Sequence, residues 1–322
     1  MKAKLSLLIF VLLMGLAACS YDVQVVTPAS DAPVTPTPVA PTFTPWVEGT
    51  EMALASPTPP ATLPPLEVTQ EVIEKPTDFS PVLYGGKQYD SEFFLLLGGV
   101  SQDAWLSPEE SVSRFSGEVT YSLSNMTVAA KYFLWGKAPE ASFTCKIYTV
   151  GSDAGLDEGG FVAVVDGWAV TKRDVTELSP DLELYQQAVL DWLKDAGVKN
   201  PELGNMQIFR VDLEGDGSDE IFISATHLDE SQHTTKTGDY SVVLMRKVVG
   251  NDVVTKLVMG DVYDSKELEI TYPRTYSLAN FIDLNQDGIL EVVVSYEKWE
   301  GFGASVFQVD GQDVYPRLNA GC

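Results

Sequence analysis

Two nine-residue stretches near the C-terminus constrain this chain most, because both carry the same pattern of oxygen-bearing side chains and glycine. The first runs from Asp212 to Glu220 (DLEGDGSDE), and the second runs from Asp283 to Glu291 (DLNQDGILE). Each has oxygen-bearing side chains at positions 1, 3, 5 and 9, glycine at position 6, and an apolar stretch directly after it. A loop of this kind can surround a hard cation, because calcium takes about six to eight oxygen ligands. The pattern therefore predicts two turns of one type, each leading into a strand.

The candidate metal ligands follow from these positions. Those of the first loop are Asp212, Glu214, Asp216 and Glu220, and those of the second are Asp283, Asn285, Asp287 and Glu291, with backbone carbonyls from Ser218 and Ile289 at position 7. An EF-hand would have a bidentate glutamate at position 12, where this chain has Ile223 and Val294, so an EF-hand is excluded. Asp-Gly turns also precede strands without any metal, and that alternative stays open. We expect one or two calcium ions.

The position of the last acid, where the apolar strand begins, gives the pattern its likeness to a known family. It resembles the FG-GAP/VCBS type of calcium loop, which occurs in integrin-like propeller blades and in many bacterial surface proteins. The resemblance covers about residues 205–322. Glu214 departs from the usual Asp or Asn at position 3. The resemblance implies calcium-binding β repeats in the C-terminal part of the chain.

The N-terminus has the pattern of a secretory signal. Lys2 and Lys4 precede an apolar run that ends in the sequence LAAC at Cys19. This sequence resembles the lipobox of bacterial lipoproteins, in which the cysteine is lipidated and becomes the first residue of the mature protein. We therefore expect a signal peptide over residues 1–18 and an extracytoplasmic protein that is anchored to the cell membrane by Cys19.

A proline-rich segment follows the predicted anchor. Twelve of the 19 prolines lie between Pro28 and Pro76, interleaved with threonine, alanine and valine. Neither a helix nor a central strand accepts this density of proline. Residues 19–80 are therefore predicted to be an extended, disordered tether.

Charge excludes one class of partner. The chain of 322 residues has a formal net charge of −25, with 46 acidic and 21 basic residues. A protein that binds nucleic acid needs clustered basic residues to neutralise phosphates, so nucleic acid is not an expected partner.

Two cysteines remain once Cys19 is assigned to the anchor. Cys145 and Cys322 are an even pair in a compartment that favours disulfides. They can form a bridge that ties the C-terminal tail to the earlier part of the folded region, or they can be two separate thiols.

The rest of the chain is predicted to fold as an α+β protein. Residues 81–204 form a mixed α/β portion with helices from Ser107 to about Phe115 and from Ser179 to Gly197. Residues 205–322 form antiparallel β repeats, each opened by one acidic loop. The loops start 71 residues apart, which suits a four-stranded repeat, and we expect two partial propeller blades.

No nucleophile elbow, phosphate loop, metalloprotease helix or dinucleotide fingerprint occurs in the chain. The favoured function is a non-catalytic binding or structural module at the cell surface, with calcium holding the β repeats. Its surface ligand would be a glycan, the cell wall or a protein, and the aromatic stretch from Trp299 to Gly303 is a candidate contact. The alternatives are a secreted hydrolase of polysaccharide or cell wall, and an accessory subunit of a membrane complex.

Overall fold

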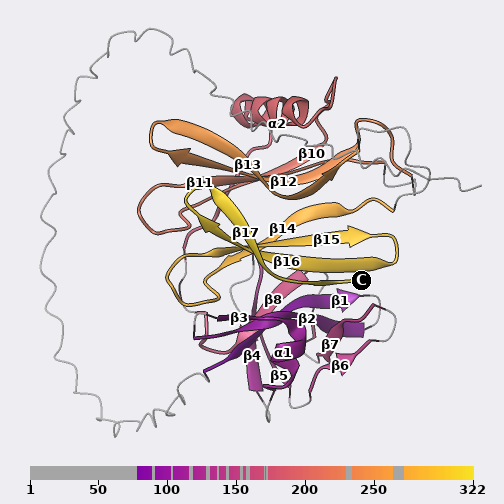
Figure 1. Cartoon of the computed structure of the whole chain (residues 1–322), viewed down its shortest axis with the longest axis vertical. Helices are drawn as coiled ribbons and strands as arrows, with labels where there is room; N and C mark the ends of the chain where they lie inside the picture. Colours follow the sequence, from indigo (N-terminus) through magenta and orange to yellow (C-terminus); the bar gives the residue numbers. More distant parts are fainter. Residues whose placement is uncertain are drawn as a thin grey trace, which may run out of the picture. The chain divides into compact units, whose positions relative to one another are not determined.

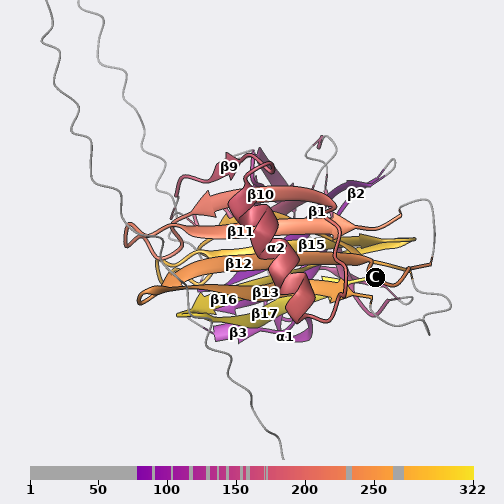
Figure 2. The same cartoon turned by 90° about the horizontal axis from the view of Figure 1, so that it is seen from above.

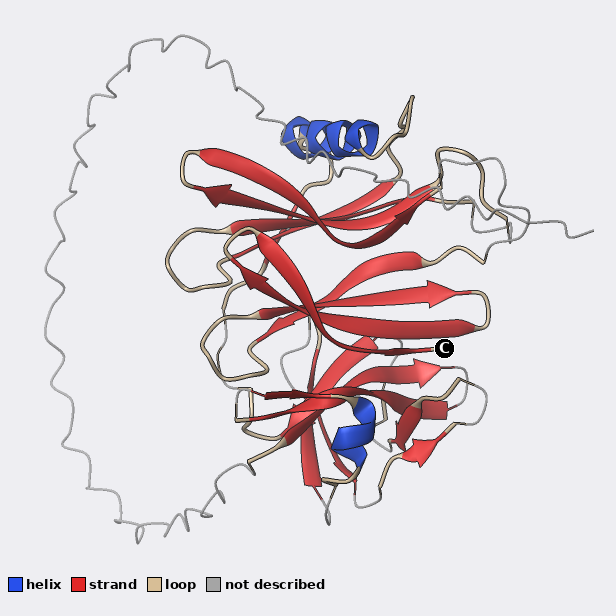
Figure 3. Ribbon diagram, in the orientation of Figure 1, coloured by secondary structure: helices blue, strands red, loops and turns tan. Residues whose placement is uncertain are grey.

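Three antiparallel sheets follow one another along the chain (Figures 1 and 3). The computed structural model describes residues 78–322 apart from gaps at 89–90, 103, 116–118, 128–130, 136–137, 143–144, 153–154, 157–159, 170, 172, 230–233 and 264–271. The predicted signal peptide, Cys19 and nearly all of the proline-rich segment lie outside the described residues. By its contacts the described part of the chain forms one compact unit.

Sheet A contains the first eight strands, in the order β5-β4-β8-β1-β2-β7-β6 with β3 paired to β2. The strands are β1 (Ser80–Gln88), β2 (Ser91–Ser101), β3 (Ala104–Leu106), β4 (Val119–Ser124), β5 (Lys131–Trp135), β6 (Glu140–Ala141), β7 (Tyr148–Gly151) and β8 (Gly160–Val165). The short helix α1 (Pro108–Val112) follows β3.

Sheet C is a meander of four strands, and sheet B adds a fifth, short strand to a meander of the same kind. Sheet B has the order β13-β12-β11-β10-β9, and sheet C has the order β14-β15-β16-β17. The strands of sheet B are β9 (Thr176–Leu178), β10 (Asn205–Val211), β11 (Glu220–His227), β12 (Tyr240–Val249) and β13 (Asp252–Val262). Those of sheet C are β14 (Thr275–Ile282), β15 (Glu291–Lys298), β16 (Gly301–Asp310) and β17 (Asp313–Gly321). Helix α2 (Glu183–Asp195) precedes β10 in the chain.

Sheet C lies between the other two sheets and is buried on both faces (Figure 1). Its strand β15 shows how this works, because successive side chains of a strand point to opposite faces. Val292 and Val294 pack against sheet B, whereas Val293 packs against sheet A. This explains why β15 reads as a continuous apolar run instead of alternating with polar residues.

The two helices cover the outer faces of the stack. Helix α2 lies across sheet B (Figure 2) and packs Val189 and Leu193, both fully buried, against it. Helix α1 begins with a capping box, in which the Ser107 N–H donates to Glu110 Oε2 at 2.8 Å and the Glu110 N–H donates to Ser107 Oγ at 3.3 Å. In the described part of the chain, no helix is long and apolar enough to span a membrane.

The expected fold class holds only in part: the antiparallel strands are present, but with only two helices among the described residues the protein is β-rich and not clearly α+β. Each helix is also shorter than its sequence signals suggested: α1 stops at Val112, and α2 starts at Glu183. The sheets are open, and the expected propeller blades are not shown. Helix α2 and strand β9, which precede residue 204, both belong with sheet B.

A disulfide joins Cys145, which follows β6, to Cys322 at the end of the chain, with the two Cα atoms 5.3 Å apart. The bridge closes 177 residues of sequence and ties sheet C to a connection of sheet A.

Candidate functional site

The two acidic loops occupy equivalent places in sheets B and C. The loop over 212–220 joins β10 to β11, and the loop over 283–291 joins β14 to β15. Each is therefore the first hairpin connection of a four-stranded meander. We expected each acidic loop to precede the first strand of its repeat. Each loop instead follows that first strand, so β14, which was expected to end the first repeat, is the first strand of the second repeat.

Both loops are built by the same three hydrogen bonds. The backbone N–H at position 2 donates to the position-9 carboxylate, the N–H at position 6 donates to position 1, and the N–H at position 7 donates to position 5. The glycines at position 6, Gly217 and Gly288, have φ angles of 88° and 87°. Side-chain-bearing residues rarely adopt such angles, so glycine is needed at this position. The repeated sequence pattern thus corresponds to a repeated backbone structure.

In the first loop the carboxylate at position 1 accepts hydrogen bonds from the loop backbone. Asp212 Oδ1 accepts from the N–H groups of Gly215 and Asp216 at 2.6 and 3.1 Å, and Oδ2 accepts from Gly217 at 2.9 Å. Burial opposes ionisation of this carboxyl, but the three donors and nearby Arg173 outweigh it and hold the pKa of Asp212 below its usual value.

A lysine from β12 neutralises the other buried acids of the first loop. Lys247 Nζ donates to Glu214 Oε1 and lies 3.2 Å from Glu220 Oε1. Glu220 is 2% exposed. Burial, with a smaller contribution from repulsion by Glu214, raises its pKa to about 7, although the N–H of Leu213 and the charge of Lys247 lower it. The other oxygen of Glu214, Oε2, is buried without a hydrogen-bond partner.

The second loop is more deeply buried. Asp283, Asn285 and Glu291 are 3%, 8% and 0% exposed, while Asp287 lies at the surface. Asp287 Oδ2 accepts from the Asn285 amide at 2.8 Å, and Asp287 Oδ1 accepts from the N–H of Ile289 at 2.8 Å. Carboxylate oxygens have further lone pairs, so these bonds leave room for a metal.

Two buried carboxylate oxygens in the second loop have no partner. Asp283 Oδ2 accepts from Gly288 at 3.1 Å and Glu291 Oε2 accepts from Leu284 at 2.7 Å, but Asp283 Oδ1 and Glu291 Oε1 accept nothing. Burial, followed by repulsion from Asp287 and Asp283, raises the pKa of Glu291 to about 8. No salt bridge within the described ranges reaches the carboxylates of this loop, and the arginine beside it, Arg173, donates to the backbone carbonyl of Gly288.

The residues opposite the two position-9 acids explain this difference. In β12, Lys247 lies next to the first residue that pairs with β11, opposite the position-9 acid of the first loop. In β16, Gln308 lies next to the first residue that pairs with β15, opposite the position-9 acid of the second loop. Gln308 Nε2 donates to Asp287 Oδ2 at 3.4 Å, but it carries no charge. Sequence analysis found neither residue.

The two loops touch each other and share one arginine. The N–H of Leu290 donates to the carbonyl of Leu213 at 3.1 Å. Arg173 Nη2 donates to the carbonyl of Gly288 at 2.5 Å, and the same guanidinium lies directly over Gly215. The loops therefore join sheets B and C at one end of the stack.

Sheet A contributes a tryptophan to the second loop. Trp168, just after β8, donates its indole N–H to the carbonyl of Leu284 at 2.7 Å, and its own carbonyl accepts from the Gln286 side chain at 2.8 Å. The Asp166-Gly167 pair is typical of a turn, but nothing in the sequence indicates that the next residue reaches the loop.

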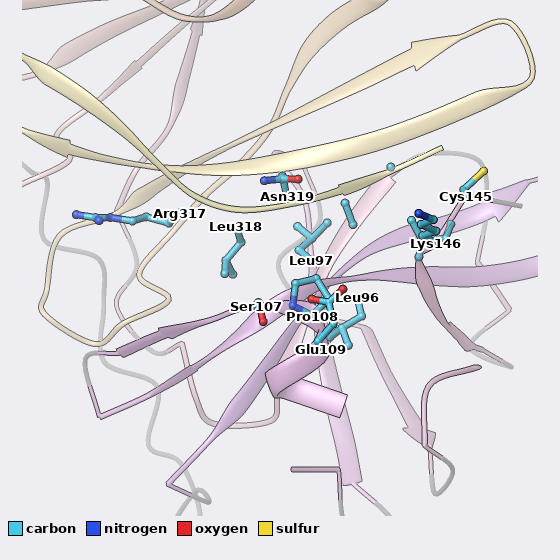
Figure 4. A pocket seen from close by; sticks show the side chains of 13 residues that line it. Leu96, Leu97, Ser107, Pro108, Glu109, Cys145, Lys146, Arg317, Leu318 and Asn319 are labelled. Atoms are coloured by element: carbon cyan, nitrogen blue, oxygen red, sulfur yellow. The ribbon is translucent and has the colours of Figure 1, made fainter. Parts of the chain in front are cut away.

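Three surface cavities lined by described residues lie away from the loops. Of the two larger, one of about 400 Å³ lies between β2, the start of α1, and β17 (Figure 4), and its charged side chains are Glu109, Lys146 and Arg317. The other, of about 740 Å³, lies beside the β15–β16 turn and is lined by Phe93, Phe302 and Cys322. Neither set contains a nucleophile paired with a base.

The second loop fits a hard cation by its chemistry. Its donors are oxygens of the kind that calcium prefers, and two of them are buried without a partner. In the described part of the chain, no three His, Cys, Asp or Glu side chains are already gathered in the arrangement of a metal site. An ion would therefore draw Asp283, Asp287 and Glu291 closer together.

Comparisons with protein-family models, with curated proteins and with solved structures find no match to this chain.

Proposed function

We propose that this protein is a non-catalytic lipoprotein of the cell surface, whose stacked β layers are stabilised by calcium in the second acidic loop. The observation that carries this proposal is the pair of partnerless oxygens, Asp283 Oδ1 and Glu291 Oε1. A buried carboxylate oxygen without a hydrogen bond or a counter-ion is costly, and a divalent cation removes that cost.

The ion would be held by the side chains of Asp283, Asn285, Asp287 and Glu291 and by the carbonyl of Ile289. When bound, it supplies positive charge directly to these carboxylates. The loop touches the first loop through Leu290 and sheet A through Trp168, so a rigid loop here stabilises contacts among all three sheets. The repeated meander with its equivalent loop supports kinship with calcium-loop β repeats.

The expected stabilisation is moderate. For a dissociation constant near 0.2 mM and calcium near 2 mM, typical of extracellular modules, one site adds about 1.4 kcal/mol. For a protein of this size, that corresponds to a rise of roughly 3–6 °C in the midpoint of thermal unfolding.

Terbium luminescence tests the site directly, because Tb³⁺ is a hard ion that replaces calcium and is excited by a nearby tryptophan. Trp168 donates to the loop backbone, so full-length protein should give sensitised terbium emission that calcium displaces. Asp287→Asn should abolish the emission and the calcium-dependent rise in midpoint. Asp216→Asn, at the same position of the first loop, is the matched control.

A Trp168→Phe variant separates binding from detection. It should lose most of the emission and still show a rise in the unfolding midpoint with calcium. Absence of both emission and a midpoint shift in the native protein would refute the calcium role.

The membrane anchor has its own test. Replacing Cys19 with alanine removes the predicted site of lipidation, and the protein should then move from the membrane fraction to the soluble extracytoplasmic fraction. A variant that stays in the membrane fraction would contradict the lipoprotein assignment.

The surface ligand is best sought beside the β15–β16 turn. Trp299 is 57% exposed there, next to the larger cavity and its Phe302 wall. An exposed aromatic beside a hollow suits stacking on a sugar ring. Trp299→Ala should weaken sedimentation with purified peptidoglycan or polysaccharide. Release of soluble fragments from either polymer would favour the hydrolase alternative.

A further inference from the structure

The two acidic loops share their backbone structure but differ in the residue opposite position 9. In sheet B that residue is Lys247, and in sheet C it is Gln308. Both side chains reach their loop: the lysine contacts the acids at positions 3 and 9, and the glutamine contacts the acid at position 5. The loops therefore differ by one positive charge at equivalent places.

Lys247 lies between two acids of the first loop, where a bound cation could also lie. Its Nζ donates to Glu214 and lies 3.2 Å from Glu220, and its side chain is only 11% exposed. An ammonium group held this way neutralises part of the acidic cluster permanently. A divalent ion brought beside it would meet repulsion from a like charge in a poorly solvated place.

We propose that Lys247 is a built-in cation that replaces calcium in the first loop, so that the second loop, with neutral Gln308, is the one that takes the metal. The residue opposite position 9 thereby determines which loop binds an ion. The assignment of the metal to the second loop rests on the proposed function, whereas the role of Lys247 in the first loop does not.

Equilibrium dialysis with radioactive calcium measures the number of ions bound by full-length protein in detergent. The native chain should bind one ion. Asp287→Asn should bind none, and Asp216→Asn should still bind one. Lys247→Gln should bind two, because it gives the first loop the residue that the second loop has. Gln308→Lys should bind none.

Lys256→Gln is the matched control for loss of a positive charge. Lys256 lies on the neighbouring strand β13, where it is 41% exposed and 4.0 Å from Asp313, a residue that belongs to neither loop. This variant should bind one ion with unchanged affinity, which excludes an effect of net charge alone.

The outcomes separate the two proposals. Two ions on the native chain, one of them lost with Asp216→Asn, would overturn the role of Lys247 and leave the calcium proposal intact. No ion on the native chain would overturn the calcium proposal, while a gain of one ion with Lys247→Gln would still support the lysine. If Lys247→Gln does not fold, Gln308→Lys decides, because an ion retained by that variant contradicts the inference.

Discussion

Glu220 and Glu291 occupy the same position of two equivalent loops, and each accepts a backbone N–H from position 2. Burial raises both pKa values, to about 7 for Glu220 and to about 8 for Glu291. The higher value belongs to the loop without a lysine. Local structure is thus the same at both sites, and burial is the main cause of both raised pKa values, with the neighbouring charges acting in addition.

These raised pKa values predict a stability that falls with pH in the presence of a chelator. An unfolded glutamate loses its proton near pH 4.5, whereas folded Glu291 keeps it to about pH 8. Between these values the folded state binds more protons, so its stability decreases as the pH rises. Urea unfolding between pH 5.5 and 8.5 should show a fall on the order of 2–4 kcal/mol.

Glu291→Gln tests the cause, because glutamine has the shape of the protonated acid and does not titrate. Its unfolding free energy should vary less with pH than that of the native chain. Millimolar calcium should also flatten the native profile, since the ion favours ionised carboxylates. A native protein whose stability rises over this pH range in chelator would contradict the prediction.

The charge difference between the loops could not be read from the sequence. Lys247 follows Glu220 by 27 residues, but Gln308 follows Glu291 by only 17, so a constant repeat spacing does not align them. The difference arises in the connection before the third strand, which is long between β11 and β12 and very short between β15 and β16. Only the strand pairing shows that the two residues are equivalent.

At the scale of elements, the acidic loops are joints between sheets as well as turns within them. Arg173, in the connection between β8 and β9, lies against both loops and donates to the second. It links three segments that are far apart in the sequence. Losing this link should weaken the packing of sheet B on sheet C.

Arg173→Ala is therefore expected to lower the free energy of unfolding by about 1–3 kcal/mol, the usual range for a hydrogen bond from a charged group. Arg210→Ala is the matched control. Arg210 also lies beside the first loop, 3.4 Å from Asp219, but its side chain is 48% exposed. Exposed ion pairs contribute little, and a loss below about 1 kcal/mol is expected there. Equal losses in the two variants would remove the argument for a joint.

The elements themselves were largely predictable, and their grouping was not. Alternation and apolar runs indicated most strands of sheets B and C, and the Ser107 cap predicted the start of α1. Strand β14 was assigned to the wrong repeat, because the order of strands and loops along the sequence does not show that β14 pairs with the strand after the acidic loop. Strand β1 was mostly missed, since Gly85 and Gly86 interrupt it.

At the scale of the whole molecule, the chain builds a stack in which each core depends on the next layer. Sheet C supplies one face to each of two cores and has no outer face of its own. Such a layer cannot be stable alone, so the sheets should unfold together. The disulfide reinforces this, because Cys322 ends sheet C and Cys145 lies in a connection of sheet A.

Removing the disulfide should destabilise the stack as a whole. The bridge spans 177 residues, for which the chain-entropy model gives about 5 kcal/mol, and measured losses are usually about 2–5 kcal/mol. The double variant Cys145→Ser/Cys322→Ser should show this loss in urea unfolding, still in one transition. Cys19→Ala is the control, because that cysteine lies outside the bridge. Two separate transitions would mean that the sheets unfold independently. Unchanged stability would mean that the disulfide does not contribute to the free energy of unfolding.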